Sequence, residues 1–100
     1  MDNIYQVSGD AYHKLGVALV ETVYNRDYYS GSITICDDDI ELTITGEFVM
    51  YFREVIDDEY YGAEALVDIS PIWWKVVATC GIDVLATDFS FDELKTYILW

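Results

Sequence analysis

Few side chains in this sequence are suited to nucleophilic, acid–base or metal chemistry, and their spacing matches no familiar site. His13 is the only histidine, and Cys36 and Cys80 lie in different segments. A nucleophile needs a base within hydrogen-bonding reach, and zinc needs four converging ligands. The sequence therefore predicts no catalytic residue, no metal site and no cofactor, and we expect the chain not to be an enzyme.

Acidic residues form two runs that offer carboxylate oxygens. The first run is Asp37-Asp38-Asp39, followed by Glu41, and the second is Asp57-Asp58-Glu59, followed by Tyr60 and Tyr61. A calcium loop places its ligands on a curved backbone with a glycine at the sharp turn, whereas consecutive side chains diverge. Asp tolerates turn geometry, so each run indicates a turn between strands rather than a metal site.

The overall charge limits the classes of partner. The chain has 19 acidic and 5 basic residues, a net charge of -14, and residues 37–68 alone contribute -10. Proteins bind nucleic acids and anionic membranes through clustered Lys and Arg, and the five basic residues here are scattered. We therefore expect no direct nucleic-acid partner and no membrane partner. A negative field does favour a protein partner with a basic surface.

Composition indicates one folded domain over residues 1–100. The chain is 53% hydrophobic and 16% aromatic, which is untypical of disordered sequences. The length suits a single core. No basic segment leads into an apolar stretch near residue 1, and no apolar run approaches the length of a membrane span. We expect a cytoplasmic protein whose two thiols are reduced and buried.

Helical patterns occur near both ends of the chain. Between residues 10 and 25, apolar side chains recur at helical spacing, and Ser8 or Asp10 can cap the start. Gly16 inside this segment indicates close packing against another element. Ser90 and Glu93 match a capping box, which predicts a second helix through Ile98.

Between these helices the apolar residues alternate, as expected for strands. The pattern predicts a first strand at 31–36 and a third from about residue 64. Between them, residues 40–53 form one long strand bent at Gly46 or two collinear strands. A bulge or break is expected at Ser70-Pro71, because proline cannot donate to a ladder. The predicted fold is α+β in the order α-β-β-β-α, an antiparallel meander with both helices on one face. This order resembles that of double-stranded RNA-binding domains, but the missing basic residues argue against their activity.

The sheet face opposite the helices is a candidate contact surface. Strand alternation assigns Val49, Tyr51, Val55, Leu66 and Trp73 to this face, and we expect Trp74 in the core. A half-apolar open face suits a partner or self-association, and the unpaired edge of the first strand is a second route to a homodimer.

Three functional hypotheses follow, and the first is preferred. In the first, the chain is a non-enzymatic binding protein that uses an acidic, tyrosine-rich surface on a protein partner. In the second, it is a homodimeric structural module. In the third, it is a nucleic-acid mimic that inhibits a basic protein, since its size and charge resemble those of small acidic inhibitors made by phages and mobile elements. The candidate partner-binding residues are Asp37, Asp38, Asp39, Glu41, Asp57, Asp58, Glu59, Tyr60, Tyr61, Tyr51 and Trp73.

Overall fold

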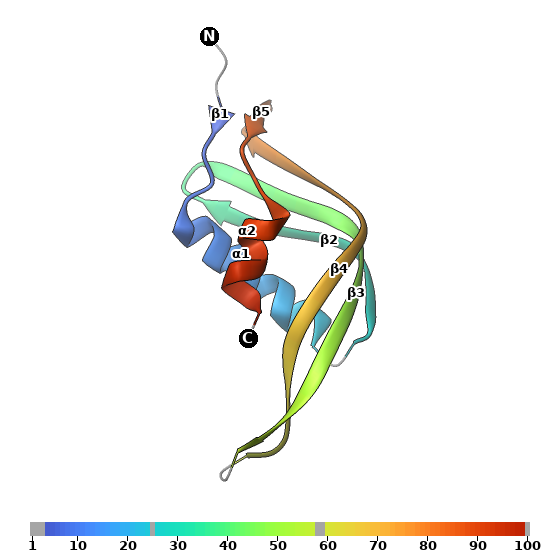
Figure 1. The fold of residues 1–100 in the computed structure, drawn as a ribbon. Coiled ribbons are helices and arrows are strands. Elements are labelled where there is room, and N and C mark those ends of the chain that lie inside the picture. Colours follow the sequence, from blue (N-terminus) through green and yellow to red (C-terminus); the bar gives the residue numbers. More distant parts are fainter. Residues whose placement is uncertain (1–3, 25, 58–59, 100) are drawn as a thin grey trace.

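The computed structural model describes residues 4–24, 26–57 and 60–99, and in these residues it has a five-stranded mixed sheet with two helices (Figure 1). The elements in chain order are β1 (Ile4–Tyr5), α1 (Gly9–Val23), β2 (Tyr28–Asp37), β3 (Ile40–Asp57), β4 (Tyr60–Cys80), β5 (Asp83–Thr87) and α2 (Phe91–Ile98). The chain is thus an α+β domain, as its sequence pattern predicts.

The order of the strands in the sheet is β1-β5-β4-β3-β2. Strands β2 to β5 form an antiparallel meander, but β1 pairs with β5 in parallel, with Ile4 opposite Ala86. The predicted order α-β-β-β-α is therefore incomplete, and the sheet is not purely antiparallel. A two-residue strand has no periodicity of its own, and its partner lies 82 residues further along the chain. Because of the two additional strands β1 and β5, the element order also differs from that of double-stranded RNA-binding domains.

Strand β3 is continuous through Gly46, where it passes very close to β4. A Cβ at Gly46 would lie 2.4 Å from the backbone oxygen of Trp73, so no side chain fits there. The predicted irregularity at Ser70-Pro71 is confirmed one residue later: Glu47 pairs with Trp73 and Phe48 with Pro71, which leaves Ile72 as the extra residue of a bulge. The predicted turn at 57–62 is shorter, because Tyr60 already pairs with Asp57.

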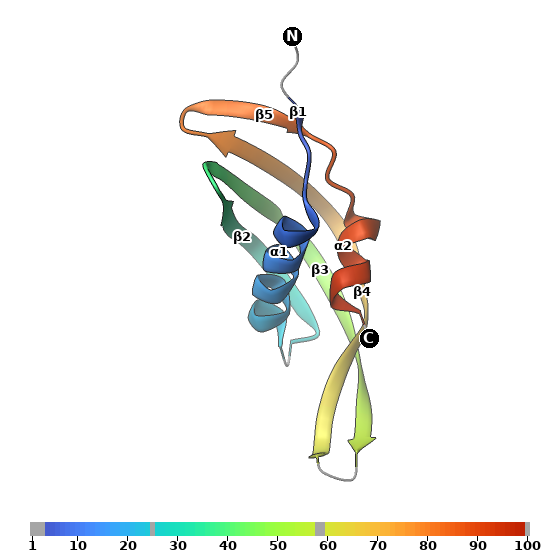
Figure 2. The same cartoon turned by 90° about the vertical axis from the view of Figure 1, so that its left-hand side faces the viewer.

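Both helices lie over the same face of the sheet (Figure 2). Ser8 caps α1 by accepting a hydrogen bond from the Ala11 amide at 3.1 Å, and Ser90 caps α2 by accepting one from the Glu93 amide at 3.3 Å. The helices pack closely where a Cβ at Gly16 would lie 2.6 Å from Ile98, as the position of this glycine predicts. The fully buried large side chains are Leu15, Leu19, Val23, Leu42, Ile44, Phe48, Ile69 and Leu94.

The molecule is elongated, with extents of 54 × 25 × 19 Å. In both ribbon views the β3–β4 hairpin reaches well past the ends of the helices (Figures 1 and 2). One face of the sheet packs on the helices, and we call the opposite face the outer face.

Candidate interaction surface

The outer face is built by the alternation of three adjacent strands. Leu42, Ile44 and Phe48 of β3 are buried toward the helices, so the residues between them point outward. Hydroxyl groups join β2 to β3 along the middle of this face: Ser32 bonds Thr45 at 2.7 Å and Thr34 bonds Thr43 at 2.8 Å. These cross-strand bonds stabilise the pairing of β2 with β3 along this part of the face.

Large apolar side chains gather at one end of the outer face. Tyr28 pairs with Val49, Tyr51 lies two residues further along β3, and Trp73 pairs with Glu47. Side chains at such positions are direct or diagonal neighbours about 5 to 8 Å apart. We call the four residues Tyr28, Val49, Tyr51 and Trp73 the outer patch.

The outer patch is open to solvent. Tyr28, Tyr51 and Trp73 are 49%, 51% and 46% exposed, and the bulge residue Ile72 is 60% exposed. In the described part of the chain no helix covers this face. The expected positions of Tyr51 and Trp73 are confirmed, whereas Leu66 is buried, because a second bulge after Tyr51 shifts the β4 register and turns Leu66 toward the core.

The first acidic run forms the turn between β2 and β3. Asp38 adopts the left-handed conformation with φ 54°, which Asp tolerates in a tight turn. Asp37 accepts a hydrogen bond of 2.6 Å from the Tyr5 hydroxyl. Burial and this bond raise the pKa of Tyr5 well above its usual value. Glu41 lies beside the turn, on the outer face opposite Cys36.

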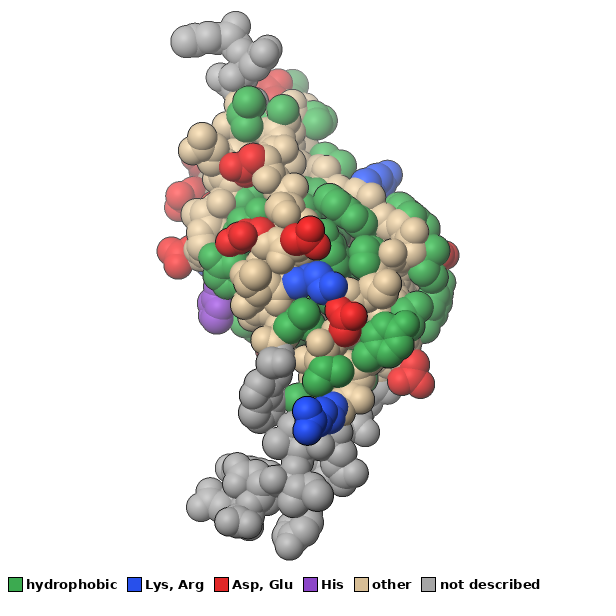
Figure 3. Space-filling model, in the orientation of Figure 1, with side chains coloured by type: hydrophobic (Ala, Val, Ile, Leu, Met, Phe, Trp, Pro, Cys, Tyr) green, Lys and Arg blue, Asp and Glu red, His purple; other side chains and the backbone are tan. Residues whose placement is uncertain are grey.

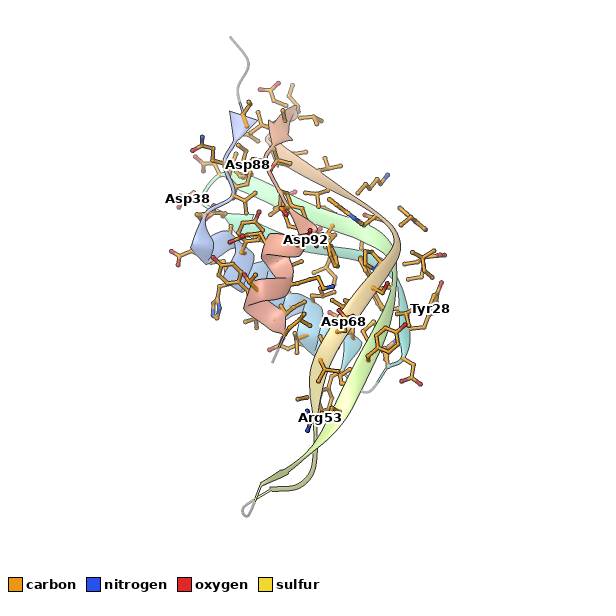
Figure 4. All side chains as sticks on the ribbon, in the orientation of Figure 1. Tyr28, Asp38, Arg53, Asp68, Asp88 and Asp92 are labelled. Carbon is orange, nitrogen blue, oxygen red and sulfur yellow. The ribbon has the colours of Figure 1, made fainter. Side chains whose placement is uncertain are left out.

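The second acidic run lies at the far end of the molecule. Asp57 ends β3, Tyr60 and Tyr61 begin β4, and Asp58 and Glu59 are outside the described residues. Asp38 and Arg53 already lie at opposite ends of the sheet (Figure 4). The structure therefore does not bring Asp57, the described acid of the second run, near the first run. On the helix side of the molecule, acidic side chains are scattered singly rather than gathered (Figure 3).

A shallow aromatic groove between β4 and α2 contains none of the candidate partner-binding residues named from the sequence. It encloses about 370 Å³ and is lined by Pro71, Trp74, Phe89, Ser90, Phe91, Asp92 and Lys95. Trp74 contacts Phe89 edge-on at 5.5 Å and also touches Phe91. Lys95 forms an ion pair with Asp68 at 2.8 Å, and its hydrogen bond is the main cause of a lowered pKa at Asp68. Trp74 lies on the helix side of the sheet but is 38% exposed along this groove, so the expectation that it belongs to the core is wrong: α2 covers its ring only in part, through Phe89 and Phe91.

The side chains with chemical potential are dispersed. His13 is exposed on α1, and Cys36 is exposed on the outer face, which contradicts the expectation that both thiols are buried. Cys36 pairs with Glu41 of β3, and Cys80 pairs with the adjacent residue Ile40. Because adjacent strand residues point to opposite faces of a sheet, the two thiols lie on opposite faces, and both are free. Among the residues that the structure describes, no three His, Cys, Asp or Glu side chains are placed to hold a metal ion.

None of the described helices has the length and apolar character required to cross a membrane. The sequence matches no protein-family model and no curated protein, and the fold matches no solved structure.

Proposed function

We propose that the chain is a non-enzymatic protein-binding module whose partner docks on the outer patch. The observation that carries this proposal is the exposure of Tyr28, Tyr51 and Trp73 around Val49 on a sheet face that no described helix covers. Tyr and Trp bury a large area at a small cost in side-chain entropy, and they are enriched among the residues that dominate binding energy.

The acidic residues have a separate part in this proposal. A net charge of -14 attracts a basic partner over a distance and raises the rate of encounter, even where acids do not touch the partner. The partner therefore combines an apolar contact area with a basic surround. Two free thiols fit a reducing compartment such as the cytoplasm.

Nucleic-acid mimicry is less well supported. A mimic presents carboxylates at a spacing comparable to that of phosphates along one continuous surface. Asp38 instead precedes β3 and Asp57 ends it, so the 18 residues of this strand separate them along the 54 Å length of the molecule. The two ideas make opposite demands on the same variants, so one experiment separates them.

The test begins with affinity capture on wild-type chain and identification of the retained protein by mass spectrometry. Binding of that protein is then measured by biolayer interferometry. Trp73→Ser and Tyr51→Ser are each expected to weaken binding by roughly 30-fold or more, mainly through faster dissociation, because each removes a large buried contact. Asp38→Lys with Asp39→Lys should slow association and leave dissociation nearly unchanged.

Tyr24→Ser is the matched control, since Tyr24 is 53% exposed but ends α1, which lies over the opposite face of the sheet. It should bind as wild type does. Equal weakening by Tyr24→Ser, or wild-type binding by the Trp73 variant, would contradict the proposal. Complete loss on reversing Asp38 and Asp39 alone would favour mimicry instead.

A further inference from the structure

Strand β2 is an edge of the sheet with one side free. It pairs with β3 over ten residues with no bulge, from Tyr28–Val49 to Asp37–Ile40. The Met50 amide donates to the Asp27 carbonyl, which makes Asp27–Met50 a hydrogen-bonded pair. Such pairs alternate along an antiparallel ladder. The residues between them therefore direct their backbone N–H and C=O groups away from β3: Tyr28, Ser30, Ser32, Thr34 and Cys36.

Two side-chain observations support this assignment. Residues in non-hydrogen-bonded pairs approach more closely, and Ser32–Thr45 and Thr34–Thr43 are the pairs whose hydroxyls bond at 2.7 and 2.8 Å. The Lys14 ammonium of α1 donates at 3.4 Å to the Cys36 carbonyl, one of the outward groups. A carbonyl has two lone pairs, so this contact leaves Cys36 able to accept a second bond.

The free edge of β2 lacks the features that usually prevent strand addition. Edges are commonly protected by charge, proline or bulges. From Tyr28 to Cys36 the sequence has no charged residue and no proline, in a chain with 24% charged residues. The part of β4 that β5 leaves unpaired carries all three protections: Pro71, Lys75 and the bulge at Ile72. The two long edges of this sheet thus differ in kind.

We propose that β2 pairs with β2 of a second copy of this chain, antiparallel and centred on Ser32. In this register Ser32 lies opposite Ser32, Ser30 opposite Thr34, and Tyr28 opposite Cys36. All five outward residues then form hydrogen-bonded pairs, and the two sheets become one sheet of ten strands with both outer patches on the same side.

The register also fits the side chains and the charges. Toward the helices, half-buried Tyr29 and Ile35 face each other across the seam, so both gain burial. At each flank Asp27 of one copy falls opposite Asp37 of the other, and Arg26, next to Asp27 in the sequence, partly offsets their repulsion. A chain of charge -14 thus meets its copy along its longest uncharged strand.

Sedimentation equilibrium tests the dimer. Wild-type chain is expected to dimerise with rising concentration. Ser32→Lys should raise the dimer dissociation constant more than about tenfold, because it sets two ammonium groups opposite each other at the seam. Thr43→Lys is the matched control: it loses the equivalent Thr34–Thr43 hydrogen bond and adds the same charge, but one strand inward and opposite the uncharged Val77. It should dimerise as wild type does.

Cysteine cross-linking tests the register in a Cys36→Ser, Cys80→Ser background. Ser32→Cys should form an intermolecular disulfide readily. Ser30→Cys and Thr34→Cys should each remain uncross-linked alone, but cross-link to each other when mixed, since their Cα atoms would lie about 5.5 Å apart across the seam. Monomeric chain at the highest attainable concentration would overturn the proposal. So would cross-linking through Thr45→Cys, which indicates contact between outer faces.

Discussion

At the scale of single residues, the hydrogen bond from Tyr5 to Asp37 joins the start of the chain to the turn between β2 and β3. The two residues are 32 positions apart, and their oxygens lie 2.6 Å apart. Burial and the neighbouring carboxylate raise the pKa of the Tyr5 hydroxyl, so it stays protonated and keeps donating. The contact therefore holds an acidic turn in place without a basic residue.

Tyr5→Phe is expected to lower the free energy of unfolding by about 1 kcal/mol at neutral pH, because Asp37 loses its donor. The folded pKa of Tyr5 is raised, so its stabilising effect is complete below its unfolded pKa of about 10 and declines as the pH rises above that value. Urea unfolding at about pH 7 and pH 11 should show the difference between wild type and variant shrinking. An unchanged difference at both pH values would contradict this assignment, and Tyr24→Phe is the control.

Single residues were predicted best where their role is local. Ser8 and Ser90 cap their helices as expected, since a cap depends on residues three or four positions away. The exposure of Cys36 was predicted wrongly, because it depends on which face of β2 is covered. The aromatic groove at Trp74 was missed, since it is assembled from β4 and α2.

At the scale of elements, β3 and β4 approach each other unusually closely at Gly46. The backbone oxygen of Trp73 and the Phe48 ring occupy the place where a side chain would be, at 2.4 and 2.9 Å from an ideal Cβ. The sequence pattern predicts no turn at this glycine, and the strand continues through it. The close approach of β4 could not be predicted, because it arises from the pairing partner.

Gly46→Ala is expected to destabilise the fold by about 1 to 3 kcal/mol, since a methyl group there requires the backbone of β4 to move. Chemical unfolding followed by tryptophan fluorescence measures the loss. Gly9→Ala is the control: its Cβ would meet the Tyr97 hydroxyl at 3.4 Å and it lies in the first turn of a helix, so we expect little change. Equal stability of Gly46→Ala and wild type would mean that the strands are further apart than described.

Element types were predicted from periodicity, and the elements that lack periodicity were missed. Both helices, β2 and β3 match the patterns that predicted them, and the Pro71 bulge follows from the missing amide of proline. Strand β5 has exposed Val84 and pairs with β4 over three residues, so its pattern is weak. Strand β1 exists because β5 does, and no local signal predicts it.

At the scale of the whole molecule, the charge of -14 is distributed over both ends and the helix side. Between the Cys36–Glu41 and Tyr28–Val49 pairs, the described outer face carries three charges, Glu41, Glu47 and Lys75. The sequence located the charge along the chain, but which of these charges lie on the outer face follows from strand alternation and from the pairing of β3 with its neighbours.

Salt should stabilise this protein. Repulsion among like charges destabilises a compact state, and raising the salt from about 0.01 M to 1 M shortens the screening length from about 30 to 3 Å. We expect Tm to rise by several degrees with sodium chloride in calorimetry, and the rise to be smaller for Asp38→Asn with Asp39→Asn. A Tm that falls with added salt would instead indicate that ion pairs such as Asp68–Lys95 dominate the surface electrostatics.

The parallel pairing of β1 with β5 also constrains how the chain folds as it is made. Ile4 pairs with Ala86, which the ribosome adds 82 residues later, about 4 to 16 s at usual synthesis rates. During that interval α1 and the β2–β3 hairpin can assemble on their own, because their partners are adjacent in the chain. Strand β1 can join the sheet only once β5 has been made, so it pairs later than α1, β2 and β3 although it precedes them in the sequence.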